Sequence, residues 1–377
     1  MMRKLLSVAG LLLSGNAIAV AGEGATRDTI AAAGATPVVA SISDVTLASV
    51  NSNLTSVNTA LNTALNTTLA SVSGAATVGL RVLSYNIQAL PSPLKKGTAP
   101  LFARIAEMLQ ERRAKGTQPH VVLLQEAFDK KTDVILEQAG YRYILKGPGK
   151  KTKAKLGQAH WVQKTRKSYV KFTDPQKFMG SGLVILSDYP IIKGHHKSFN
   201  SDECAGIDCM ANKSMQMARI DVPGLAQPVD IVNSHFNSRR SAKAPRKLSL
   251  KIHHKQTDKL KWFLKKTGVG NPVIVAGDFN TKQGARYEYF AKKIALTDAG
   301  TQCVSDNAGC IIAKGTKVEM VLFDTNDKHF YEASDTVSIA PYFIERNFAE
   351  TLDGKELSDH LGYEIHYKLS SQPVAND

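Results

Sequence analysis

Short apolar runs that each end in polar residues recur along this chain, and they constrain its fold more than any other feature. The runs are brief and rich in β-branched residues, which is typical of buried strands. The polar residues at their ends are Asn86, Glu126, His235 with Asn237, Asp278 with Asn280, and Asp359 with His360. Because the ends of neighbouring strands lie side by side, we expect these residues to converge on one cleft.

The chemistry of these strand ends indicates a phosphate-processing site. One Asp or Asn after an apolar run is usually a turn residue. Here the pattern recurs five times, and it includes the segments GDFN (277–280) and SDH (358–360). Carboxylates, carboxamides and histidines together can bind a hard divalent cation and move protons around a phosphate group.

The same region alternates strand patterns with helix patterns. Residues 99–116 and 248–268 have apolar residues at helical spacing, and each stretch ends in a glycine. His253 and His254 stand among lysines in the second stretch, so we expect them to be solvated. The alternation predicts two packed sheets with helices outside, in one catalytic domain over residues 79–377.

The N-terminal region predicts export. Residues 1–21 have a basic start, a short apolar run and small residues at a possible cleavage site, as in a secretory signal peptide. Residues 22–78 are rich in Ala, Ser, Thr and Asn, which indicates a stalk; an amphipathic helix is the alternative. We therefore expect a secreted or periplasmic protein.

The net charge of +15 favours an anionic target, either nucleic acid or a negatively charged membrane. Residues 142–171 hold ten Lys or Arg and no Asp or Glu, which predicts a surface loop. Such a loop could bind phosphates or an anionic leaflet, and it could equally be only solvated.

Four cysteines suit an exported protein, and they stand in two close pairs. Cys204 is near Cys209, and Cys303 is near Cys310. Local pairing is the simplest of the three possible connectivities. A four-cysteine zinc site is the alternative, but these spacings do not match paired zinc knuckles.

With GDFN and SDH following the earlier strand ends in this order, the chain resembles the endonuclease/exonuclease/phosphatase superfamily from about Leu80 to about Leu369. This group includes pancreatic DNase, inositol-phosphate phosphatases and neutral sphingomyelinases. The resemblance implies an α/β fold, namely a four-layer sandwich of two packed mixed β-sheets flanked by helices, with the site at one edge of the sheets.

The residues and the resemblance together suggest specific roles. Glu126 is the expected ligand of Mg²⁺ or another divalent cation, with Asn86 supporting it. His360 is the expected general base, and His235 the group that protonates the leaving oxygen. The other expected members of the site are Asp278 beside the attacking water, Asn280 and Asn237 on phosphate oxygens, and Glu319 as the carboxylate that orients His360. Asp359 could either support a neighbouring site residue or be a weak metal ligand.

The segment CAGIDCMANKS (204–214) resembles the sphingomyelinase branch, and there Lys213 could bind the phosphate. Tyr342 and Phe343 lie upstream of SDH, where bacterial sphingomyelinases carry a membrane-inserting hairpin, and we expect them to form an exposed tip or a buried turn. The prediction is an exported Mg²⁺-dependent phosphodiesterase of the phospholipase C type acting on sphingomyelin at a phospholipid surface. The alternatives are a DNase-like nuclease acting on nucleic acid, and a binding module without catalysis.

Overall fold

The computed structural model describes residues 77–92, 94–152, 161–165, 168–172, 177–282, 284–305 and 309–372. The chain divides into two compact units, Met1–Ser73 and Gly74–Asp377, and the second contains every described residue. The predicted signal peptide lies outside the described residues. The same holds for the predicted stalk, except for its last two residues.

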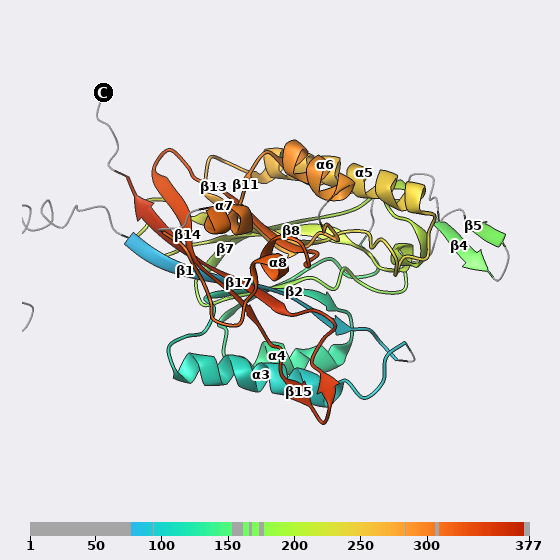
Figure 1. Ribbon diagram of the computed structural model, residues 1–377, viewed down its shortest axis with the longest axis horizontal. Helices are drawn as coiled ribbons and strands as arrows, with labels where there is room; N and C mark the ends of the chain where they lie inside the picture. Colours follow the sequence, from blue (N-terminus) through green and yellow to red (C-terminus); the bar gives the residue numbers. More distant parts are fainter. Residues whose placement is uncertain are drawn as a thin grey trace, which may run out of the picture. The chain divides into compact units, whose positions relative to one another are not determined.

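The first sheet has seven strands in mixed orientation (Figure 1). Its parallel pair, β1 and β2, comes from the first two strands of the chain, and the other long pairs are antiparallel. In spatial order the strands are β12 (Ile311–Ile312), β14 (Val337–Asn347), β17 (Gly362–Ser371), β1 (Thr77–Ala89), β2 (Val121–Ala127), β6 (Val184–Ser187) and β3 (Tyr143–Lys146).

The second sheet has six strands, and its parallel pair is β9 and β10. In spatial order its strands are β11 (Thr297–Asp298), β13 (Asp327–Glu332), β10 (Val273–Asp278), β9 (Val229–His235), β8 (Ser214–Ile220) and β7 (Ile191–Ser198). Two small antiparallel pairs complete the strands, namely β4 (Trp161–Thr165) with β5 (Ser168–Phe172) and β15 (Thr351–Leu352) with β16 (Lys355–Glu356).

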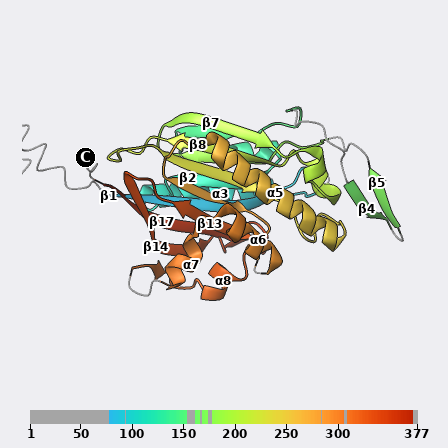
Figure 2. The ribbon, with the colours of Figure 1, turned by 90° about the horizontal axis from the view of Figure 1, so that it is seen from above.

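Helices cover the outer faces of both sheets, which gives the four layers that Figure 1 shows. In the view from above in Figure 2, α5 lies across the strands of the sheets. On the first sheet these are α3 (Ala99–Ala114) and α4 (Asp133–Gln138), and the short η1 (Lys130–Thr132) directly precedes α4. The remaining helices are α5 (Arg246–Thr267), α6 (Ala285–Ile294), α7 (Ala299–Ser305), α8 (Val318–Leu322), η2 (Ser201–Glu203) and η3 (Gly206–Met210). The predicted helices correspond to α3 and α5, and the predicted fold class is confirmed. Among the described residues, no helix is long and apolar enough to cross a membrane.

The alternation of side chains along each strand builds three apolar cores. In β1, Leu80 and Val82 face the space between the sheets, whereas Leu83, Tyr85 and Ile87 pack against α3 on the outer face. The outer core of the second sheet gathers phenylalanines from β10, β13, α5 and α6. This period of two is the expected result of a sheet buried on both faces.

Toward one end, the space between the sheets changes from apolar to polar. Gln125 of β2 donates a hydrogen bond to Asn233 of β9 across the sheets, with an Nε2–Oδ1 distance of 2.9 Å. Asn86, His235 and Asp278 continue the same inward-facing registers beyond this pair and are all nearly fully buried. The strand alternation that builds the core therefore also aims the predicted site residues into one space.

Two sequence predictions about surface segments need correction. Tyr342 and Phe343 do not form a tip or a turn; they lie within β14, where Phe343 pairs with His366 of β17. The hairpin before SDH is instead β15–β16, whose turn is the polar pair Asp353 and Gly354. Part of the basic segment 142–171 is not loop but the strand pair β4–β5, while residues 153–160 and 166–167 lie outside the described part of the chain.

Candidate active site

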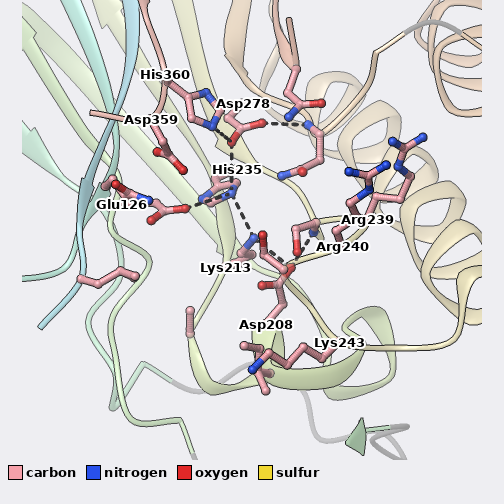
Figure 3. Close-up of a pocket in the computed structure, with 18 of the residues that line it drawn as sticks. Glu126, Asp208, Lys213, His235, Arg239, Arg240, Lys243, Asp278, Asp359 and His360 are labelled. Atoms are coloured by element: carbon pink, nitrogen blue, oxygen red, sulfur yellow. Dashed lines mark hydrogen bonds and ion pairs between the residues drawn. The ribbon is translucent and has the colours of Figure 1, made fainter. Parts of the chain in front are cut away.

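A cleft of about 850 Å³ opens at the polar end of the two sheets. Because β1 runs parallel to β2, and β9 runs parallel to β10, the carboxyl ends of all four strands reach this edge. The cleft is lined by seven of the predicted site residues, which Figure 3 labels with the exception of Asn280: Glu126, Lys213, His235, Asp278, Asn280, Asp359 and His360.

The backbone near the cleft is held in unusual conformations. Glu126 has a φ of 56° and Asn280 has a φ of 52°, both in the left-handed region that non-glycine residues seldom adopt. Gly277, just before Asp278, has a φ of 152°, and a Cβ there would lie 2.2 Å from the carbonyl oxygen of Ser234. Only glycine lets β10 approach β9 this closely and so bring Asp278 beside His235.

Asn86 connects the two carboxylates at the floor of the cleft. Its Nδ2 lies 3.2 Å from Oε1 of Glu126 and 3.0 Å from Oδ2 of Asp278, while its Oδ1 accepts a hydrogen bond from the amide of Gln88. Asn86 therefore presents its nitrogen to the site and steadies two acidic groups. This differs from the prediction that Asn86 helps to ligate a cation.

Glu126 has the character of a cation ligand. Burial raises the pKa of its carboxyl to about 7, against the opposing effects of Lys213 and the Asn86 amide. Asp278 and Asp359 add negative charge nearby. A buried carboxylate among other carboxylates gains most from a hard divalent cation, so these residues fit Mg²⁺.

A second acidic cluster is less suited to a cation. Ligand atoms of Asp278, Asp327 and His360 lie within 4.8 Å of one another. However, Asp327 already has two cationic partners, because its Oδ2 lies 3.1 Å from Nδ1 of His360 and 3.9 Å from Nη2 of Arg346. The charge of Asp327 is therefore compensated within the protein, whereas that of Glu126 is not.

Asp327, and not Glu319, orients His360. The orienting carboxylate was predicted to be Glu319 on a strand before SDH, but that stretch is the helix α8. Asp327 begins β13, which runs antiparallel to β10, so its first residue lies opposite Asp278, the last residue of β10. The site residues were predicted at the ends of strands, whereas Asp327 stands at the start of β13.

The pKa values of the two histidines are shifted in opposite directions. Burial, followed by the charge of Lys213, lowers the pKa of His235 to about 3. Burial also opposes the charge on His360, but Asp327, Asp278 and Asp359 outweigh it and raise the pKa of His360 to about 10. The Nε2 atoms of His235 and His360 lie 3.4 Å and 3.8 Å from Oδ2 of Asp278, so one carboxylate lies between both rings.

Lys213 directly precedes β8 of the second sheet and reaches the site from there. Its Nζ lies 3.1 Å from Nε2 of His235, 3.2 Å from Oδ2 of Asp208 and 2.7 Å from the carbonyl oxygen of Phe236. The side chain is nearly buried, so its charge is directed into the cleft. The segment 204–214 thus places a cation beside His235.

Asn237 does not have the predicted role. It is fully buried, its Oδ1 accepts a hydrogen bond from the amide of Ala205 at 2.8 Å, and its Nδ2 donates to the carbonyl oxygen of Ser238 at 2.9 Å. Its side chain holds the 204–209 loop in place and has no hydrogen bond left for a phosphate. Asn280 does line the cleft, with its Nδ2 3.1 Å from the carbonyl oxygen of Phe236.

Both predicted disulfides are present, Cys204–Cys209 and Cys303–Cys310, which leaves no free cysteine and excludes the four-cysteine zinc site.

His253 was predicted to be solvated, and this prediction was wrong. His253 is fully buried on α5, and its Nε2 lies 3.0 Å from the carbonyl oxygen of Phe279, next to the catalytic segment.

Several solved structures resemble this fold over most of the chain. Sphingomyelinase C from Streptomyces griseocarneus is 20% identical with a TM-score of 0.53, and the match covers 77% of this chain and 99% of that one. A beta toxin mutant from Staphylococcus aureus, solved with bound magnesium ions, is 18% identical with a TM-score of 0.53 and coverages of 78% and 100%. D. rerio TDP2 complexed with a single-strand DNA product is 16% identical with a TM-score of 0.50 and coverages of 77% and 98%.

No curated protein matches this chain. These identities are low, so the structural matches show the fold alone. The sequence itself matches the model of the Endonuclease/Exonuclease/phosphatase family over residues 83–296, a range that carries Asn86, Glu126, His235 and Asp278. The acidic and histidine side chains at the open end of the paired sheets thus belong to a phosphoesterase fold, and the chain is a member of the Endonuclease/Exonuclease/phosphatase family.

Proposed function

We propose that this protein is an exported, Mg²⁺-dependent phosphodiesterase of the phospholipase C type, and that it releases phosphocholine from sphingomyelin. The observation that carries the proposal is the convergence of Glu126, His235, Asp278 and His360 on one cleft. Phosphodiester hydrolysis uses carboxylates, two histidines of different pKa and a nearby lysine, and this cleft holds all of them.

Each residue of the cleft has a distinct role in the proposed reaction. Asp327 fixes the ring of His360, so that its Nε2 faces Asp278 and can take a proton from an attacking water. Lys213 and Asn280 bind oxygens of the scissile phosphate, and His235 gives a proton to the departing oxygen. A cation held by Glu126 would supply Lewis-acid stabilisation of the phosphate charge.

The proposed roles require the charge states of the two histidines to change when the site is filled. His360 is raised in pKa by the surrounding carboxylates, and a cation held by Glu126 would offset part of this negative charge so that the ring could lose its proton. A phosphate beside Lys213 and His235 adds negative charge there and raises the pKa of His235, which then can act as an acid.

Two findings support sphingomyelin as the substrate. The segment 204–214 resembles the sphingomyelinase branch, and it places Asp208 and Lys213 at the cleft. Solved structures with this fold include sphingomyelinase C. The two disulfides also suit an exported protein.

Polynucleotide is the second candidate substrate. The net charge of +15 favours it, and so does the fold likeness to a TDP2 structure that holds a single-strand DNA product. The fold and the catalytic groups are compatible with both phosphodiesters.

Hydrolysis of sphingomyelin, phosphatidylcholine and plasmid DNA, measured side by side with Mg²⁺ and with EDTA, tests the proposal. We expect release of phosphocholine from sphingomyelin with Mg²⁺ and none with EDTA. Cleavage of DNA alone would indicate that polynucleotide, and not a lipid, is the substrate. No turnover of any of the three would contradict the proposal.

A further inference from the structure

Five exposed cations belong to the lining of the cleft. We call Arg239, Arg240, Lys243, Arg246 and Lys282 the cationic wall. Figure 3 shows Arg239, Arg240 and Lys243 across the cleft from Glu126. Within the described part of the chain, no side chain of the wall takes part in an ion pair or a side-chain hydrogen bond, and the proposed catalytic roles use none of them.

The balance of charge in the cleft is positive. Its lining holds seven Lys or Arg, against the four carboxylates of Glu126, Asp208, Asp278 and Asp359. Glu126 and Asp278 are taken up by the proposed cation and water, and Asp208 is paired with Lys213. The wall therefore presents uncompensated positive charge toward whatever enters beside the scissile phosphate.

The backbone holds the wall in place. The amide of Ile207, within the disulfide loop 204–209, donates to the carbonyl oxygen of Ala242 at 2.9 Å, and the amide of Lys243 donates to that of Arg240 at 3.0 Å. A Cβ on Gly206 would lie only 1.8 Å from the Ala242 oxygen. This close packing fixes the turn that carries three of the five cations.

The position of Arg246 does not help the helix that carries it. Arg246 and Lys247 occupy the first turn of α5, and no acidic residue stands there. Positive charge near a helix N-terminus is unfavourable, because the helix dipole is positive at that end. An anion bound at the wall would relieve this repulsion, whereas the folded chain alone gains nothing from it.

An apolar rim lies at the same cleft. Leu90, Leu94, Met179 and Met210 belong to its lining, and Leu94 is 60% exposed. Exposed aliphatic side chains next to cations are typical of surfaces that enter the interface of an anionic membrane. Single-stranded nucleic acid would instead be expected to stack its bases on several aromatic side chains, whereas Phe128 is the one Phe, Tyr or Trp among the described residues that line this cleft.

We propose that the cationic wall and the apolar rim form a docking surface for membranes that contain anionic phospholipid. The wall binds the phosphates of anionic lipids around the substrate, and the rim contacts their acyl chains. This inference rests on the proposed lipid substrate and extends it, because it makes the composition of the surrounding membrane a determinant of binding.

Vesicle co-sedimentation of the full-length Glu126→Gln variant tests the inference without lipid turnover. Vesicles of phosphatidylcholine alone are compared with vesicles in which part of the phosphatidylcholine is replaced by phosphatidylserine. We expect clearly tighter binding to the second kind. Adding the changes Arg239→Gln, Arg240→Gln and Lys243→Gln should weaken that binding on the order of 100-fold, because each cation near an anionic surface contributes about fivefold.

The matched control neutralises the same number of charges near the C-terminal ends of α5 and α6. Lys265, Lys266 and Lys292 are exposed and lie outside the cleft lining. Their change to Gln should weaken vesicle binding far less than the wall variant. Equal losses of vesicle binding in the two triple variants would show that binding depends only on net charge, and this would overturn the inference.

Two further results would also overturn it. One is equal binding of the Glu126→Gln chain to both kinds of vesicle. The other is a wall variant that loses binding to single-stranded DNA but keeps binding to anionic vesicles, which would make the wall a polynucleotide site. Vesicle binding with the expected pattern, in a wild-type chain that does not hydrolyse sphingomyelin, would retain the docking surface and reject the proposed substrate.

Discussion

At the residue scale, strand position explains which site members could be predicted from the sequence. Glu126, His235, Asp278 and His360 follow apolar runs, so a search of strand ends found them. Asp327 escaped because antiparallel pairing brings the start of β13 to the same edge. Asn237 was misassigned because the sequence does not show that its amide is used up by the 204–209 loop.

The role of Asp327 predicts a shift in the pH profile. Loss of this carboxylate in Asp327→Asn lowers the pKa of His360, so the acidic limb of kcat/KM should move to lower pH. We also expect the maximal rate to fall by about 100-fold, since the ring loses its orientation. The matched control Glu319→Gln should behave like the wild type, and movement of the alkaline limb instead would make His360 the acid.

The two histidines should act as one unit. His235→Ala and His360→Ala should each lower kcat by about 100-fold or more, with the fold retained by circular dichroism. Because both rings serve one proton transfer sequence around Asp278, the double variant should lose less than the product of the two single losses. A fully multiplicative loss would indicate that the two rings act independently.

At the scale of elements, the sequence predicted the two long helices and the strand exits well, because burial of one face imposes a clear period on each. It did not distinguish an apolar strand from an exposed tip. Tyr342 and Phe343 were predicted to form an exposed tip or a buried turn, yet Phe343 pairs with His366 of β17 and Tyr342 stands at a register shift between Pro341 and Phe343. A bulge of this kind depends on the partner strand, which local sequence does not reveal.

The two disulfides should differ in what they do for activity. Each closes a short loop, so changing both cysteines of either pair to Ser should lower the free energy of unfolding by about 2 kcal/mol. Loss of Cys204–Cys209 should also lower activity several-fold, because this loop carries Asp208, the partner of Lys213. Loss of Cys303–Cys310 is the matched control, and equal activity of the two variants would show that the first loop does not position the site.

At the scale of the whole molecule, one sheet-to-sheet space serves both stability and function. Apolar residues fill most of it, the pair Gln125 and Asn233 marks its polar boundary, and the site lies beyond that boundary. The same space also encloses His329, whose ring lies 3.2 Å from the hydroxyl of Tyr367 and 3.1 Å from the carbonyl oxygen of Tyr363.

Burial of His329 predicts acid sensitivity. Burial lowers its pKa from 6.5 to about 3, so below pH 6.5 the unfolded chain takes up a proton that the folded chain excludes. Stability is therefore lost as the pH falls from about 6.5 toward about 3. In His329→Gln the slope of unfolding free energy against pH should decrease by up to about 1.4 kcal/mol per pH unit, whereas a change of the exposed His196 to Gln should leave the slope as it was.

We propose that one cleft hydrolyses phosphodiesters with a cation held by Glu126. A Mg²⁺ titration of sphingomyelin hydrolysis tests this most directly. Wild-type protein and Glu126→Gln, which keeps the shape of the side chain, should be compared in the same detergent micelles. We expect saturable activation of the wild type by Mg²⁺, and a loss of orders of magnitude in the variant with its fold intact. Turnover of the variant at wild-type rates and at low Mg²⁺ would contradict the account.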